Sequence, residues 1–199
     1  MIRKTVALCI AALLLAGWAG AVFAAEFTAD MVIMSTLGGE MPGKVFVKGQ
    51  KMRQEIATPQ GDQAMILDPA KNVIYVLMPG APIYMEVENK EPSVVALGEG
   101  ETLASRFEGE ADVRHEGVEN IEGYACDKYF VDFHDPEMGE STIWVAGKIN
   151  FPIKIHSKNS KDTVTVLYSN IEEGSVDDSL FSVPSGYQKL EFGMSGQEY

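Results

Sequence analysis

The sequence has few cysteines: only Cys9 and Cys126. Cys9 lies within an apolar N-terminal stretch, so the rest of the chain has one thiol and cannot form an intramolecular disulfide. Its fold must therefore be held together by its hydrophobic core. Cys126 is either a reactive thiol or a small apolar side chain on a strand. We favour the second interpretation, because buried thiols are common in protein cores.

Positive charge is also scarce. The chain has 29 acidic and 16 basic residues, and two of the basic ones, Arg3 and Lys4, lie at the extreme N-terminus. The residues from 25 onward carry a formal net charge of −15. Such a surface repels phosphate backbones and anionic membrane surfaces. We therefore expect no nucleic-acid partner and no stable membrane insertion.

Signatures of catalysis, metal binding and nucleotide binding are missing as well. The turn His134-Asp135-Pro136-Glu137 contains three possible ligands, but its spacing matches no zinc pattern. No Gly-x-Ser-x-Gly motif marks a nucleophilic serine, and Gly98-Glu99-Gly100 lies in an acidic segment that would repel a phosphate. We expect a protein that is not an enzyme, without catalytic residues, metal or cofactor.

The N-terminus has the pattern of a secretory signal peptide. Arg3 and Lys4 precede an apolar core at 6–15, and Val22-Phe23-Ala24 provides small residues for a signal peptidase. We predict cleavage after Ala24 and a periplasmic location. No cysteine follows at 18–28, so a lipid anchor is not expected. Residues 25–192 are then one β domain, and residues 193–199 a flexible tail.

The stretch 43–87 predicts consecutive strands joined by tight turns. Apolar and polar residues alternate along much of it, which is typical of a sheet with one face against a core. Further strand patterns lie at 26–37, 111–118, 124–134, 141–146, 151–157 and 163–171. Short connections favour antiparallel neighbours in one large meander. We expect a mostly β protein whose curved sheet of about 10–11 strands curls on itself.

Two stretches break the strand pattern. Residues 89–109 have no period of two and predict a short helical or irregular insertion over one face of the sheet, with disorder as the alternative. Asp177 to Phe181 predicts one helical turn capped by Asp177.

One face of the predicted sheet is rich in aliphatic side chains and methionine. Methionine is flexible and polarisable, so such a face accommodates varied apolar ligands; the alternative is that these side chains fill a core. The residues assigned to this ligand-binding face are Met31, Ile33, Val45, Val47, Met52, Ile56, Ile83, Met85, Val164, Val166 and Tyr168.

The meander also resembles a known family. The segments VFVK at 45–48, MRQE at 52–55, ILD at 66–68 and VIY at 73–75, with Pro59 between them, resemble the LolA/LolB-like periplasmic lipoprotein carriers. The stretches 119–129 and 180–187 are similar to an exported bacterial family of uncharacterised domains related to those carriers. Where the carriers have a lid-closing arginine, this chain has Lys48 and Gly49. It also has a strand pattern in place of their N-terminal helix.

The resemblance implies an unclosed β-barrel whose concave apolar face takes up acyl chains, at ~0.8 kcal/mol for each buried methylene. We therefore expect a non-enzymatic periplasmic protein that binds an acyl chain, a lipoprotein or another apolar ligand. The alternative is an envelope protein-interaction or stress-sensing module, with a protein partner, a filled core and no small ligand.

Overall fold

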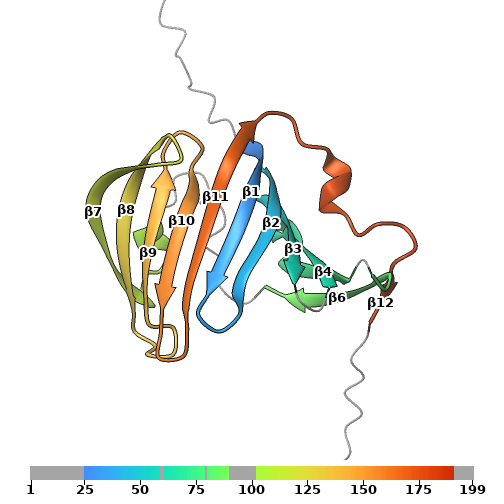
Figure 1. Ribbon diagram of the computed structural model, residues 1–199, viewed down its shortest axis with the longest axis horizontal. Coiled ribbons are helices and arrows are strands. Elements are labelled where there is room, and N and C mark those ends of the chain that lie inside the picture. The colour runs from blue at the N-terminus through green and yellow to red at the C-terminus, as the bar shows by residue number, and fades with distance from the viewer. Residues whose placement is uncertain (1–24, 59–60, 79, 90–101, 191–199) are drawn as a thin grey trace, which may run out of the picture.

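The computed structural model describes residues 25–58, 61–78, 80–89 and 102–190. One twelve-stranded sheet that does not close dominates this part of the chain (Figure 1). The strands are β1 (Glu26–Ser35), β2 (Gly39–Lys48), β3 (Lys51–Thr58), β4 (Gly61–Asp68), β5 (Val73–Met78), β6 (Ile83–Glu88), β7 (Ala111–Ile121), β8 (Tyr124–Phe133), β9 (Glu140–Ala146), β10 (Phe151–Lys158), β11 (Thr163–Glu173) and β12 (Gln188–Lys189). The helical elements are η1 (Pro69–Lys71), α1 (Leu103–Arg106) and η2 (Asp178–Phe181).

The sheet consists of two meanders, β1 to β6 and β7 to β11, which are joined at its centre. Its strand order is β12-β6-β5-β4-β3-β2-β1-β11-β10-β9-β8-β7, so β1 pairs with β11. The prediction of a single meander was wrong on this point, because the long connection after β6 takes the chain to the opposite edge of the sheet. The mostly β, curved and unclosed architecture is confirmed. The additional strand, β12, consists of two residues parallel to β6.

The first hairpin differs from its prediction. The sequence analysis left residues 38–42 between two predicted strand stretches, 26–37 and 43–87, but β2 already begins at Gly39. Pro42 lies within β2 opposite Val32. Pairing between β2 and β3 starts only at Gly43, so Pro42 occupies a position without a β3 neighbour. A proline is tolerated there because no ladder hydrogen bond to a third strand is required.

The backbone register shows which side chains share the inner face. One row of laterally paired residues runs from Ile33 on β1 through Val166, Ile155 and Ile143 to Tyr129 on β8. Paired residues of neighbouring strands point to the same side. Leu103 and Phe107, in and just after α1, belong to a buried cluster with Ile143 and Val145, and Ile155 packs against it. The short helix α1 therefore covers the part of the concave face formed by β8 to β10, and a short helical element over this face was predicted.

The outer face of the first meander is covered by the C-terminal segment, residues 174–190 (Figure 1). Phe46, Ile66 and Tyr75 lie on this face, and Val176 and Phe181 pack in the same cluster. The Asp177 side chain accepts a hydrogen bond from the Ser179 N–H and begins η2, which confirms the predicted cap.

The main core gathers buried side chains from β1 to β4 and from β8 to β11. Phe151 is fully buried and makes edge-to-face contacts with Phe27 and Tyr168, with ring centroids 5.0 and 5.1 Å away. Register shifts next to Thr28 and Pro152 increase the local twist where these rings meet. Three predicted features lie outside the described residues: the signal peptide, most of the 89–109 insertion and the 193–199 tail.

Candidate functional site

The residues predicted to bind a ligand share one face of the sheet. Ile33 is paired with Val166, and Val47 with Met52. The register continues from Gln54 through Met65 and Val76 to Met85. This places the complete predicted set on the inner face: Met31, Ile33, Val45, Val47, Met52, Ile56, Ile83, Met85, Val164, Val166 and Tyr168. The common face follows from the register; binding by these residues stays a prediction.

Burial divides this set in two. Val45 and Val47 are fully buried, and Met31, Tyr168 and Met52 are 3%, 4% and 7% exposed. These side chains belong to the filled core, which agrees with the alternative that the sequence left open. The remaining predicted residues are half-buried: Ile33, Ile56, Ile83, Met85, Val164 and Val166.

Strands β4 to β6 contain inner-face residues that the sequence analysis missed. Met65, Ile74, Val76 and Met78 are half-buried, and Val87 is 47% exposed. Together with Ile56, Ile83 and Met85 they form an apolar surface, here called the open strip. Strand β5 is apolar on both faces, because its outer face packs under the C-terminal segment. Because apolar and polar residues do not alternate along this strand, the sequence could not show which of its side chains point inward.

A polar pair lies where the filled core meets the open strip. The Gln54 Nε2 donates a hydrogen bond of 3.1 Å to the Tyr168 hydroxyl. Burial raises the pKa of Tyr168 to about 12, so the phenol stays neutral. Gln54 is half-buried and is flanked on its face by Val45 and Met65.

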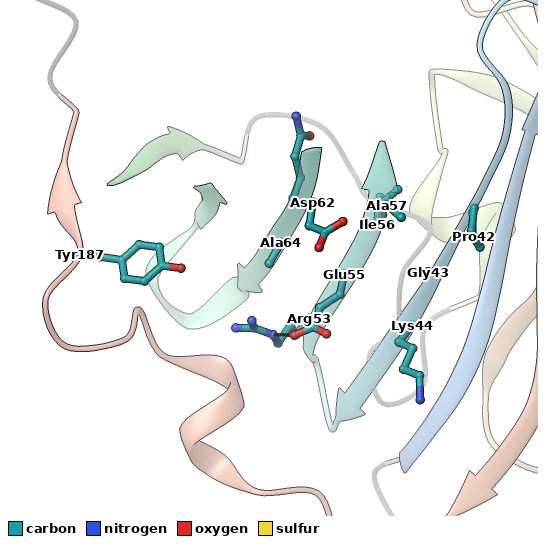
Figure 2. A pocket seen from close by; sticks show the side chains of 11 residues that line it. Pro42, Gly43, Lys44, Arg53, Glu55, Ile56, Ala57, Asp62, Ala64 and Tyr187 are labelled. Carbon is teal, nitrogen blue, oxygen red and sulfur yellow. Dashed lines mark hydrogen bonds and ion pairs between the residues drawn. The ribbon is translucent and has the colours of Figure 1, made fainter. Parts of the chain in front are cut away.

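A hollow with a volume of about 580 Å³ lies on the outer face. Figure 2 shows that its floor is formed by β2 to β4 and that Tyr187, from the C-terminal segment, faces them. The apolar residues that line it from the outer face are Pro42, Ala57 and Ala64. We call it the outer groove.

The outer groove contains charges of both signs. The Arg53 Nε donates to Glu55 Oε1 at 2.8 Å, and its guanidinium also donates to the Leu180 carbonyl at 3.2 Å. Lys44 and Asp62 also line the groove, and both are exposed. The groove therefore offers hydrogen-bonding and charged groups of both signs, unlike the inner face.

Other reactive groups lie apart from both surfaces. Cys126 is completely buried in β8, and burial raises the pKa of its thiol, which supports its interpretation as a core residue. The side chain of His134 faces the Gly109 carbonyl and Asp112 at the surface. Within the described ranges, no three His, Cys, Asp or Glu side chains are grouped to hold a metal ion.

Among the residues described, no helix is both long and apolar enough to span a membrane. A search of curated proteins finds no significant match.

Solved structures that this chain resembles share little sequence with it. An uncharacterised conserved protein from Thermus thermophilus has a TM-score of 0.54 at 10% identity, over 83% of this chain and 90% of that one. A chain of the Pseudomonas aeruginosa MucA/MucB complex has a TM-score of 0.54 at 11% identity, over 80% of this chain and 56% of its own length. A LolA superfamily protein from Nitrosomonas europaea, NE2245, is matched at 14% identity with a TM-score of 0.39, over 80% and 90%.

The two matches with TM-scores of 0.54 show that this chain shares its fold with those structures. This chain spans little more than half of the MucA/MucB chain that it matches. The family model covers most of the chain, at residues 27–150 and 143–187. The protein therefore belongs to the family described as "Domain of unknown function (DUF4412)".

Proposed function

We propose that this protein is a non-enzymatic binding protein, active in the periplasm, that holds an acyl chain on the open strip of its inner face. The observation that carries the proposal is the open strip itself. Its aliphatic and methionine side chains are accessible on a face whose centre is otherwise filled. Contiguous apolar surface of this kind, left accessible, typically marks a binding site.

The chemistry of the face supports an apolar ligand. None of the inner-face positions on β1 to β6 carries a charge. Each methylene transferred from water to such a surface gains ~0.8 kcal/mol, so a long chain gains enough to bind without a charged contact. Met65, Met78 and Met85 can adapt to chains of different shape.

Two measurements test this function. Native mass spectrometry of protein purified from the periplasm should show bound lipid, which delipidation removes. The stripped protein should then take up a fluorescent fatty-acid derivative. A clean unliganded mass together with no uptake would reject the proposal.

A pair of methionine variants locates the site. Met85→Lys places a cation in the open strip and should lower acyl-chain affinity by roughly tenfold or more, because the ammonium resists desolvation. Met34→Lys is the matched control, since Met34 is 39% exposed on β1 and its register partner Thr165 is an outer-face residue. Equal losses in the two variants would place the site elsewhere.

A second candidate function is protein binding, favoured by the outer groove. Its mixture of charged, hydrogen-bonding and apolar groups suits an extended peptide, and the MucB structures with the same fold include complexes with MucA. Lys44→Glu would then reduce capture of an envelope protein and leave acyl-chain uptake unchanged. Unchanged capture by this variant would count against the groove.

A further inference from the structure

We propose that the inner-face site selects ligands whose acyl chain carries a neutral carbonyl group, an ester or an amide, and that Gln54 recognises this group. The inference rests on the proposed function, because it concerns the same face. It adds a chemical class of ligand and a specificity-determining residue.

The first argument is the geometry of Gln54. One N–H of its amide donates to the Tyr168 hydroxyl at 3.1 Å, which holds the side chain on the inner face. A glutamine amide has two N–H donors and a carbonyl acceptor. The second N–H and the carbonyl oxygen have no hydrogen-bond partner among the described residues. The side chain is half-buried and its unpartnered carbonyl oxygen is not sealed from solvent, so a ligand beside the open strip can reach the amide.

The second argument is the surroundings of this amide. Its register partners are Val45 and Met65, and the row continues through Val76 to Met85. An acyl chain lying along this row would bring its polar end to Gln54 at the boundary of the filled core. A ligand carbonyl oxygen placed there accepts a hydrogen bond from the free N–H of Gln54. This bond replaces the one to water that the oxygen loses on binding.

The third argument is charge. The inner-face positions of β1 to β6 and β11 include no lysine or arginine. The phenol of Tyr168 is also neutral. A free carboxylate would therefore lose its water at this site and gain no cation in return. An ester or amide carbonyl loses much less hydration free energy on leaving water, and one hydrogen-bond donor is enough to satisfy it. The arrangement thus favours acyl esters and amides over free fatty acids.

The experiment compares three probes of equal chain length: a pyrene-labelled fatty acid, its methyl ester and the corresponding pyrene-labelled alkane. At about pH 8, where the acid is ionised, we expect the stripped protein to bind the ester roughly tenfold more tightly than the acid. Gln54→Met retains length and apolar bulk and removes the hydrogen bonds. It should lower ester affinity by roughly fivefold and leave alkane affinity unchanged.

Gln63→Met is the matched control. Gln63 lies on the same face of β4, paired with Ile56, and is also half-buried. This variant should retain the preference for the ester. A second readout is the infrared carbonyl stretch of a ¹³C-labelled ester, which should shift to lower frequency on binding to the wild type and shift less in Gln54→Met.

The outcomes separate this inference from the function on which it rests. If none of the three probes binds, the proposed function fails. If all bind and the wild type prefers the acid or does not discriminate, the selectivity proposal is overturned and the binding function stands. An ester preference that survives Gln54→Met, or an unshifted carbonyl stretch in the wild type, overturns the role of Gln54.

Discussion

Gly43 lies directly against the methyl group of Met31 on the inner face of the β1–β2 hairpin. A Cβ atom added at residue 43 would lie 2.9 Å from Met31 Cε and would overlap the Glu55 carbonyl oxygen of β3. The two residues are register partners, so the missing side chain makes room for the buried thioether. Glycine is required here for close approach and not for its backbone freedom.

Gly43→Ala should therefore destabilise the protein by about 1–3 kcal/mol, the usual cost of overpacking a core. Urea unfolding followed by circular dichroism measures the change. Gly147→Ala is the control, because a Cβ there meets no atom within 4 Å. Equal effects of the two substitutions would show that the space beside Met31 is not limiting.

Cys126 should be almost inert in the native protein. It is fully buried, its thiol donates to the Tyr124 carbonyl, and burial raises its pKa, so little thiolate is available at neutral pH. The native protein should react with a thiol reagent at least about a hundredfold more slowly than the urea-unfolded chain, since reaction requires opening of the structure. Rapid native labelling would instead support the reactive thiol that the sequence left possible.

Asp162 should make stability depend on pH. Hydrogen bonds from the Ser35 and Thr36 hydroxyls hold the pKa of this carboxyl below its usual value. A group with a lowered folded-state pKa contributes stability above its unfolded pKa and loses that contribution as the pH falls through the folded-state pKa. Asp162→Asn should thus lower the melting temperature clearly at about pH 7 and progressively less below about pH 4.

Differential scanning calorimetry across this pH range tests the prediction for Asp162. Asp62→Asn is the control, because it removes the same charge from an exposed position at the start of β4. If the melting temperatures of Asp162→Asn and the wild type differ by the same amount at all pH values, the titration of Asp162 is not coupled to stability.

Much of the inner face was predictable because alternation is a local signal. Val45, Val47 and Met52 each have a lysine or arginine as a chain neighbour and follow a period of two within their strands, and the structure places all three on one face as predicted. Strand β5 gave no such signal. Ile74 and Val76 point inward, whereas Val73 and Leu77 are buried on the outer side, and nothing in the local sequence distinguishes the two sets.

Long-range pairing explains what else was missed. The central pairing of β1 with β11 joins segments about 140 residues apart, as the contact of Asp30 with Asn170 illustrates. The polar pair of Gln54 and Tyr168 forms only because of this topology. Each residue looks ordinary in the sequence, a polar side chain in β3 and an aromatic one in β11, so no local pattern could predict that they meet.

The C-terminal segment should contribute strongly to stability through Phe181. This side chain is 4% exposed and packs in the outer-face cluster with Ile66 and Leu77. Phe181→Ala should lower the free energy of unfolding by about 3–5 kcal/mol, since it removes a buried aromatic ring and leaves a cavity over β4 and β5. It should also increase the fluorescence of a hydrophobic dye, because the outer face of the first meander becomes accessible.

Leu190→Ala is the control for this prediction. Leu190 lies just beyond β12 and is 40% exposed, so its truncation should change stability by no more than about 0.5 kcal/mol. Acyl-chain binding should be nearly unchanged in both variants, because the C-terminal segment packs on the face opposite the open strip. If Phe181→Ala lowers the free energy of unfolding no more than Leu190→Ala does, the C-terminal segment does not stabilise the sheet.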